Sequence, residues 1–546
     1  MIENMPSLFL NRKNTIRIKT VVQIIPKMRG ECELEKSPLL TSTKEGFRFE
    51  EVTVRQLQAG YEAGEFTVEE VITSYLERIE QFEEIYNAFT FMNPTVLEEA
   101  KEIDRLREAG AQLGPLAGIP IVIKEAVDVA GYPSTFGWAP LCKDEGGFEL
   151  MPKNDATIVT RLKNAGVMIL GKTNIPAFSC AYNANNSWDG PTYNAVNRSL
   201  SPGGSSSGTA TSVSGNFTVL GIAEETAGSI QVPAAAQAIV GIKPTFGLIP
   251  SRGVTPLAGS TRDVLGPHAR TVEDAAALLS VLAGYSQDDP KTEAAIGKVP
   301  VEGYTAFLDA GALKGKRIGL YGSGWRREEL SSETKELYAA AIEVLESQGA
   351  EVVTDPFAGT KLAEYMESKD SFIGMETFFY DLEKYLKNLD PEDETISIKS
   401  VFEKVGQVPW TEDGPLGLVY DIINEETAAA DPSVLPDLTE FNEVKTELLR
   451  VIHTVMEEKQ LDGFAYPQMP EAIPERSVEN VKSTTISEIN ISGLPLITVP
   501  AGYYQSGSPF ALAFFGKAFS EAELIAMAYA YEQATKHRVA SILISK

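Results

Sequence analysis

The sequence of 546 residues predicts an α/β protein, in which short buried strands alternate with amphipathic helices. Three segments lead to this prediction. Residues 118–124 (GIPIVIK) are a short apolar run rich in β-branched residues, which is typical of a buried strand. Residues 316–353 have the pattern strand, helix, strand of a βαβ unit. Residues 520–535 (SEAELIAMAYAYEQAT) have a helical pattern, with Ser520 at the N-cap position.

The other elements follow in chain order. Apolar residues recur at helical spacing between residues 68 and 79, and Thr67 with Glu70 forms a capping box, so an amphipathic helix opens the domain. The strand at 118–124 ends at Lys124, which must face whatever lies beyond the sheet. A helix is expected from Asp155 to Ala165, because Gly166 can end it, and the run VMIL that follows is expected to form a strand.

Two long segments lack this regularity. Residues 190–208 form a loop rich in Gly, Ser, Pro and Asn, and loops of this length inside a compact domain are usually functional. Residues from about 355 to 440 are expected to form a variable cap. Near the end, LPLITVPAG (494–502) has the pattern of another buried strand.

Composition limits the possible partners and location. The chain carries 48 Lys and Arg against 76 Asp and Glu, a net charge of −28, which repels phosphate groups and argues against nucleic acid and anionic membranes. The longest apolar stretches, such as 275–283, are shorter than the roughly 18–20 residues of a membrane span. Three scattered cysteines suggest neither a disulfide framework nor a metal cluster, so we expect free thiols in a cytoplasmic protein. Residues 1–45 are interpreted as an extension of unknown role.

Three short motifs match other enzyme classes and are rejected on context. Residues 166–173 (GVMILGKT) satisfy the P-loop pattern, but four apolar residues suit a strand rather than a phosphate cradle. Residues 204–208 (GSSSG) match the nucleophile elbow with Ser206 as nucleophile, which requires a histidine partner and a preceding strand. Of the three histidines, His453 and His537 lie in helical patterns, and the preceding residues are loop-like. Ser332 and Lys335 form an S-x-x-K pair without K-T-G, and Ser332 is expected to cap a helix.

A different set of motifs points to one family. The segments SPGGSSSG (201–208), ETAGSI (225–230) with Pro233 and Ala234, and GIKPTFGLIP (241–250) are similar to the signature stretch of the amidase signature family. GIPIVIKEAVDVAG (118–131) resembles that family's lysine segment, and GKTN (171–174) and SGLPLITVPAG (492–502) fit as well. The resemblance runs from about residue 50 to 540. It implies the amidase signature fold, a large mixed β-sheet covered by helices on both faces, as a single domain at 46–546.

The resemblance also implies site residues. The family's nucleophile falls on Ser229, its bridging serine on Ser205, following a cis peptide at Gly204–Ser205, and its lysine on Lys124. Ser206 is expected to hydrogen-bond Lys124. The backbone N–H groups of Thr226, Ala227, Gly228 and Ser229 are expected to form the oxyanion hole. The loop after GKTN would form a pocket wall, with Phe178, Ser179 and Cys180 nearest Ser229.

Elementary chemistry agrees with these roles. A serine hydroxyl is a weak nucleophile until a base removes its proton, and a neutral lysine can act as that base. Burial at the end of an apolar strand favours the neutral amine. The resulting activity is amide hydrolysis through an acyl-enzyme, which needs no metal or other cofactor.

The sequence departs from the family pattern at four places. Ala227 stands where glycine is usual, Glu224 and Glu225 where Thr-Asp is common, Gln231 where arginine is frequent, and Glu125 where aspartate follows the lysine. Because a methyl group disfavours positive φ, Ala227 puts the geometry of the oxyanion loop in question.

Other functions remain open at this level. A transamidase component that acts on charged transfer RNA uses the same core, although a charge of −28 argues against direct RNA contact. A non-catalytic binding protein could retain the fold. We expect a small-molecule amide as substrate and no membrane partner, with a homodimer left open, and the residues do not distinguish arylamides, peptide amides, carbamates and aliphatic amides.

Overall fold

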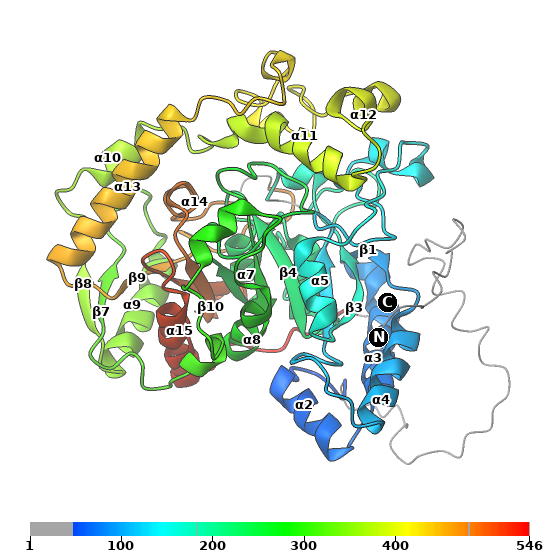
Figure 1. Cartoon of the computed structure of the whole chain (residues 1–546). Helices are drawn as coiled ribbons and strands as arrows, with labels where there is room; N and C mark the ends of the chain where they lie inside the picture. Colours follow the sequence, from blue (N-terminus) through cyan, green and yellow to red (C-terminus); the bar gives the residue numbers. More distant parts are fainter. Residues whose placement is uncertain (1–46, 183, 479–480, 545–546) are drawn as a thin grey trace.

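An 11-stranded mixed β-sheet forms the centre of the molecule (Figure 1). The computed structural model describes residues 47–182, 184–478 and 481–544, so the expected extension at 1–45 lies outside the described residues. The strand order is β1-β3-β2-β4-β6-β5-β10-β11-β9-β7-β8. The strands are β1 Phe89–Met92, β2 Pro120–Lys124, β3 Met168–Thr173, β4 Leu220–Glu225, β5 Val240–Lys243, β6 Val264–Ala269, β7 Arg317–Leu320, β8 Glu351–Thr354, β9 Gly463–Pro467, β10 Leu496–Tyr503 and β11 Pro509–Phe515.

Parallel and antiparallel pairs occur in different parts of the sheet. Strand β2 pairs in parallel with both β3 and β4, and β7 pairs in parallel with β8 and β9. From β4 through β6, β5, β10 and β11 to β9, each successive pair of strands is antiparallel, and so is the pair of β1 and β3. The predicted α/β class and the mixed sheet are therefore confirmed.

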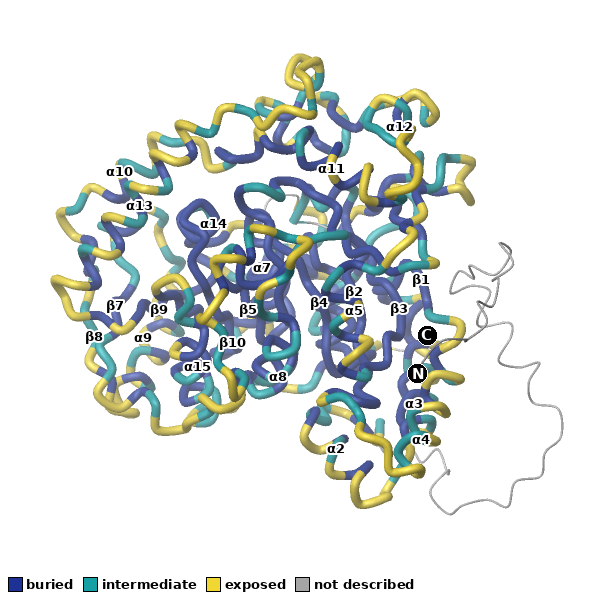
Figure 2. The backbone as a smooth tube through the Cα atoms, in the orientation of Figure 1, coloured by how far each residue is buried: buried dark blue, intermediate teal, exposed yellow. Residues whose placement is uncertain are grey.

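Helices cover both faces of the sheet. Helix α15 contacts both α8 and α9, and α6 and α7 contact each other and strands of the sheet. Figure 2 shows the central strands buried, with exposed positions on the outer helices. The α-helices are α2 Val54–Ala63, α3 Val68–Tyr86, α4 Val96–Glu108, α5 Thr157–Asn164, α6 Ser207–Ser214, α7 Gln231–Ala236, α8 Val272–Leu282, α9 Ser332–Ser347, α10 Leu362–Glu367, α11 Phe378–Leu389, α12 Ile398–Val405, α13 Thr439–Glu458, α14 Ser487–Ser492 and α15 Glu521–Thr535.

Several local predictions can be compared with these elements. The capping box of Thr67 and Glu70 is present at the start of α3. The P-loop-like segment forms strand β3, and its Lys172 is buried and donates to the carbonyl of Pro133, so the strand interpretation is confirmed.

The starts of two later helices differ in how well they were predicted. The prediction that Ser332 caps α9 is wrong, because the side chain of Ser331 accepts the capping hydrogen bond. Ser520 occupies the N-cap position of α15 as predicted. Its hydroxyl donates to the Lys517 carbonyl oxygen, however, and accepts no capping hydrogen bond from the helix.

The region predicted as a variable cap contributes no strand between residues 356 and 438, all of which are described. Helices α10, α11 and α12 lie along one rim of the sheet, together with α13 (Figure 1). Side chains from α11 and α12 pack into an apolar cluster with Phe136, Trp138 and Phe178. This cluster joins the rim to the loops that follow β2 and β3.

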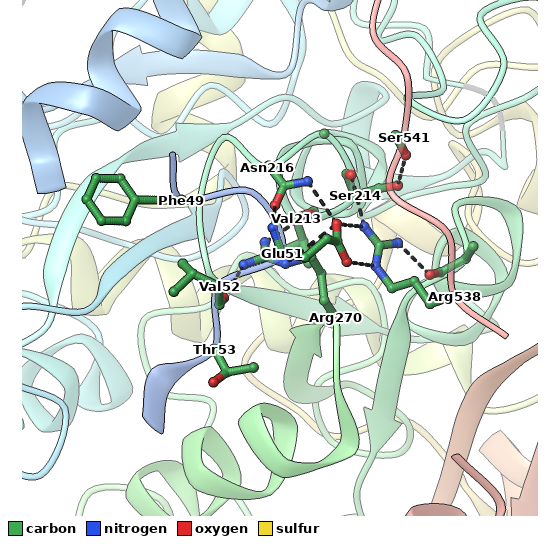
Figure 3. Close-up of polar contacts among 12 residues, drawn as sticks. Phe49, Glu51, Val52, Thr53, Val213, Ser214, Asn216, Arg270, Arg538 and Ser541 are labelled. Carbon is green, nitrogen blue, oxygen red and sulfur yellow. Dashed lines mark hydrogen bonds and ion pairs between the residues drawn. The ribbon is translucent and has the colours of Figure 1, made fainter. Parts of the chain in front are cut away.

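The two ends of the described chain are held together by a charged cluster (Figure 3). The guanidinium of Arg538, beyond α15, donates to both carboxylate oxygens of Glu51, each at 2.7 Å. Asn216 donates to the same carboxylate at 2.9 Å, and Arg270 lies 4.0 Å from it. Although burial opposes ionisation, the two arginines lower the pKa of Glu51. These contacts hold two segments that are 487 residues apart in the sequence next to each other.

Within the described part of the chain, every helix is too short or too polar to cross a membrane.

Candidate active site

The ends of β2 and β4 bring a lysine and two glutamates together. Because the two strands are parallel neighbours, with Ile123 opposite Ile222, their carboxyl ends meet at the same edge of the sheet. Lys124 is the last residue of β2, and Glu224 and Glu225 end β4. The Lys124 side chain has no solvent exposure. A buried amino group at this edge needs acceptors for its N–H groups.

The serine-rich loop delivers one of these acceptors. The Gly204–Ser205 peptide is cis, and Lys124 Nζ lies 2.7 Å from Ser205 Oγ. Helix α6 begins two residues later, at Ser207. A Cβ at Gly208 would lie 2.4 Å from the carbonyl oxygen of Ala88, so only glycine lets the loop approach this closely.

Glu224 supplies the other two acceptors. Lys124 Nζ lies 2.7 Å from Glu224 Oε2 and 3.1 Å from the Glu224 carbonyl oxygen. Both side chains are almost completely buried, with relative exposures of 0% and 3%. The sequence marked Glu224 only as a departure from the family pattern and did not predict this ion pair.

Ser206 contacts Glu224 instead of Lys124. Its hydroxyl donates to the Glu224 carbonyl oxygen at 3.1 Å and accepts from the Glu224 N–H at 3.3 Å. Lys124 and Ser206 therefore share one carbonyl acceptor. The expected direct hydrogen bond between them is replaced by this shared contact.

Ser229 lies in the loop between β4 and α7. Gly228 takes the positive φ of 99°, whereas Ala227 is not among the residues with positive φ, so the concern about the Ala227 methyl group is unfounded. In the described part of the chain, the N–H groups of Thr226, Ala227, Gly228 and Ser229 donate no hydrogen bond. They are available to an oxygen atom that enters the loop.

The Glu225 carboxylate holds this loop in shape. It accepts from the N–H groups of Ile230 and Gln231 at 2.7 and 3.1 Å, and from the side-chain amides of Gln231 and Asn490. Gln231 also accepts from Gln468 at 2.7 Å. The glutamine at position 231 thus links the loop to β9, whose last residue precedes Gln468.

Ser229 borders a pocket whose empty volume, including the open solvent at its mouth, is about 310 Å³. Of the three predicted wall residues, Ser179 and Cys180 line it, whereas Phe178 packs behind it against Phe136 and Trp138. Thr226 and Ala227 also line the pocket. Ala181 and Tyr182 of the same predicted loop also line it, and residues that the sequence did not single out complete the lining: Leu257, Phe372, Met375, Leu418 and Val419.

Burial sets the state of several neighbouring groups. It raises the pKa of the Cys180 thiol to about 12, so this side chain is a neutral part of the wall. Burial and the nearby Glu224 raise the pKa of Asp263 to about 7. Asp263 accepts a hydrogen bond of 2.6 Å from Thr226 Oγ1, which itself lies 3.2 Å from Glu224 Oε1.

Two observations bear on the proton path. The described hydroxyls of Ser205 and Ser229 are not hydrogen-bonded to each other, so the path from Ser229 to Lys124 has an open link. His268 is buried and its Nε2 lies 2.8 Å from the Ile230 carbonyl oxygen. Burial lowers the pKa of His268 to about 4, and this contact with a carbonyl does not supply the histidine that a Ser206 elbow requires.

Comparisons with known proteins cover most of the chain. The family model described as Amidase matches residues 70–525. A component of the glutamyl-tRNA(Gln) amidotransferase from Cyanothece sp. is 31% identical over 88% of this chain and 98% of that protein.

Two solved structures extend the comparison. The native peptide amidase from Stenotrophomonas maltophilia superimposes with a TM-score of 0.76, at 32% identity over 92% of this chain and 100% of that one. An amidase family protein from Bacillus anthracis gives a TM-score of 0.74 at 28% identity, over 98% of this chain and 96% of that one. The family match over most of the chain and these likenesses show that the chain belongs to the amidase signature family.

Proposed function

We propose that the protein is an amidohydrolase that cleaves the C–N bond of a carboxylic amide through an acyl-enzyme on Ser229. Ser205 is the bridge and Lys124 the base. The observation that carries this proposal is the 2.7 Å contact between Lys124 Nζ and Ser205 Oγ, completely buried beside the loop that bears Ser229. A buried lysine in contact with a serine hydroxyl is an arrangement suited to general-base chemistry.

The reaction follows from these positions. Ser229 Oγ attacks the amide carbon as its proton passes to Ser205 Oγ, and the Ser205 proton passes to Lys124 Nζ. The N–H groups of Thr226, Ala227, Gly228 and Ser229 stabilise the oxyanion. The proton returns along the same path to the leaving amine, and water then hydrolyses the ester on Ser229. The open link between Ser205 and Ser229 closes when substrate binds, as catalytic hydrogen bonds often tighten in the complex.

The pocket favours an apolar group on the substrate. Most of its lining side chains are apolar, and Phe372, Met375, Leu418 and Val419 come from the rim segment. The similarity to a peptide amidase at 32% identity supports a linear amide, including a small peptide amide, as the substrate class. A covering of apolar side chains also excludes water from the acyl-enzyme until the amine has left.

A component of an amidotransferase complex is the second candidate. The similarity to the glutamyl-tRNA(Gln) amidotransferase component, at 31% identity, is nearly as high as that to the peptide amidase. The net charge of −28 opposes direct contact with RNA, so a partner protein would have to supply that surface. A non-catalytic binding protein is the third candidate, and the retained Lys124, Ser205 and Ser229 argue against it.

The remaining assignments are also proposals. Residues 46–546 are assigned to one catalytic domain, because strands from residues 89 to 515 belong to one sheet. A cytoplasmic location is supported by the three scattered cysteines. A homodimer is compatible with these features, and the chemistry calls for no cofactor.

Turnover of p-nitroanilides, primary amides, peptide amides and carbamates tests the proposed function. The purified chain alone is expected to hydrolyse at least one of these classes, and Ser229→Ala to hydrolyse none. Glutamine-dependent ammonia transfer only in the presence of a copurifying protein would favour the amidotransferase complex. If the chain binds an amide but neither hydrolyses it nor reacts with a fluorophosphonate, the result would favour the binding protein.

A further inference from the structure

We propose that Glu224 is a positioning residue, which aims one N–H of Lys124 at Ser205 and, through its negative charge, keeps that lysine protonated until a higher pH. The inference rests on the proposed function and deepens it.

The geometry fills every position around the lysine nitrogen. An ammonium group has three N–H donors, and Lys124 Nζ has three acceptors: Ser205 Oγ at 2.7 Å, Glu224 Oε2 at 2.7 Å and the Glu224 carbonyl oxygen at 3.1 Å. Glu224 alone provides two of them. The remaining N–H must therefore point at Ser205.

The same arrangement serves the neutral lysine. A neutral amine keeps two N–H donors and gains one lone pair. If the two donors stay on Glu224, the lone pair replaces the N–H that faced Ser205. Ser205 Oγ–H can then donate to that lone pair, which is the orientation that the proton path requires. Glu224 thus determines where the lone pair forms.

The charge of Glu224 acts on the same step. An opposite charge at hydrogen-bond distance favours the protonated lysine, whereas burial favours the neutral amine. Thr226 Oγ1 lies 3.2 Å from the second oxygen of Glu224 and 2.6 Å from Asp263 Oδ1, so its single proton serves one of the two carboxylates at a time. The ion pair between Lys124 and Glu224 lies in a region that is almost completely shielded from solvent.

The other charged groups around this pair come from three neighbouring elements. Asp263, before β6, faces Glu224, and burial with the charge of Glu224 raises its pKa to about 7. His268 on β6 is neutral above its lowered pKa of about 4. Glu125 follows Lys124, and its pKa is raised by burial, against which the charge of Lys172 on β3 acts.

Among these charged groups, Glu224 is the one in direct contact with Lys124. Burial lowers the pKa of Lys172, which interacts with Glu125 and Asp128 rather than with Glu224. Removal of the Glu224 charge should consequently release the lysine proton at lower pH. The structural effect of the side chain and the effect of its charge can be separated by substitution.

The experiment measures, from pH 5 to 10, the rate at which a fluorophosphonate labels Ser229 and kcat/KM for an amide that the wild type hydrolyses. Glu224→Gln keeps an oxygen acceptor and removes the charge. The rising limb of its pH–rate profile should move to lower pH by about 1–3 units, which is the effect of one adjacent opposite charge. The rate on the high-pH plateau should change little. Glu224→Ala removes both the charge and the side-chain acceptor. The limb of its profile should therefore also move, and its plateau rate should fall below that of the glutamine variant.

The control is Glu532→Gln on α15, the same change at a partly buried carboxylate that accepts from Val272 N–H and does not contact Lys124. Its limb should stay at the wild-type pH. If Glu224→Gln does not fold, Glu224→Thr removes the charge with a smaller polar side chain, and the rising limb of its pH–rate profile should move in the same direction. A purely structural role would lower the rate at all pH values without moving the limb.

An unmoved limb in Glu224→Gln or Glu224→Thr, or a limb displaced to higher pH, overturns the inference while leaving the proposed function intact. A wild-type protein that is not labelled on Ser229 at any pH contradicts the proposed function itself, and the inference fails with it.

Discussion

Lys124 Nζ and Ser205 Oγ lie 2.7 Å apart at the end of two parallel strands, and neither side chain has any solvent exposure. In the proposed mechanism these two groups form one path for a proton, because Ser205 can give up its hydroxyl proton only if Lys124 accepts it. Removal of either group should therefore remove most of what the pair contributes.

The first prediction concerns this dependence. Ser205→Ala and Lys124→Ala should each lower kcat/KM by roughly 10²–10⁴, the usual contribution of general acid–base catalysis. The double variant should lose little more than either single variant, because members of one relay are not additive. Steady-state kinetics on the three variants measure this. A double variant whose loss equals the product of the two single losses would show that the groups act independently.

The second prediction concerns the pocket wall. Cys180 lines the pocket and is 6% exposed, so a larger residue would overpack this site, whereas Cys180→Ala enlarges the pocket. In Cys180→Ala, the kcat/KM for an amide with a bulky acyl group, divided by that for an amide with a small one, should rise by about tenfold. This is the size expected for a small change in an apolar pocket.

Cys142→Ala is the matched control for the second prediction. Cys142 is equally buried, at 5% exposure, and does not line the pocket. Its substrate ranking should remain that of the wild type. If Cys180→Ala leaves the ranking unchanged, or if both variants change it equally, Cys180 is not a specificity-determining residue.

The third prediction concerns stability and pH at the Glu51–Arg538 pair. Glu51→Gln removes the negative charge from the partly buried hydrogen bonds with Arg538. The free energy of unfolding should therefore fall by about 1.5–3 kcal/mol at neutral pH. The folded-state pKa of Glu51 is lowered, so its contribution is present above the unfolded pKa and is lost as pH falls through the folded pKa. The difference between wild type and variant should thus shrink in acid.

Urea denaturation of both proteins at pH 7 and in acid checks this, with Glu50→Gln as control. Glu50 is the adjacent glutamate, is exposed, and accepts no side-chain hydrogen bond in the described part of the chain. A destabilisation by Glu50→Gln as large as that by Glu51→Gln would contradict the account. So would a wild-type advantage that persists unchanged in acid.

How far the sequence predicts this structure depends on the range of the interactions involved. The end of a strand at Lys124 follows from a local run of β-branched residues, and the capping box of α3 from four consecutive residues. The error at the start of α9 is a displacement by one position, where the neighbouring Ser331 and Ser332 compete for the same role.

The less predictable parts of the site depend on contacts between distant segments. The pairing of Lys124 with Glu224 requires β2 and β4 to be neighbours, which residues 100 positions apart do not reveal. Phe372 and Leu418 reach the pocket from a segment without periodic pattern. The expected difficulty at Ala227 is absent because the next residue, Gly228, takes the positive φ.

The most direct test of the central claim is the location of a covalent adduct. Intact-protein and peptide mass spectrometry after treatment with a fluorophosphonate should find the label on Ser229 in the wild type. Ser229→Ala should not be labelled, and Ser205→Ala should be labelled on Ser229 slowly, because it keeps the nucleophile but lacks the proton path. A label on Ser206, or a label that survives in Ser229→Ala, would contradict the assignment of the nucleophile.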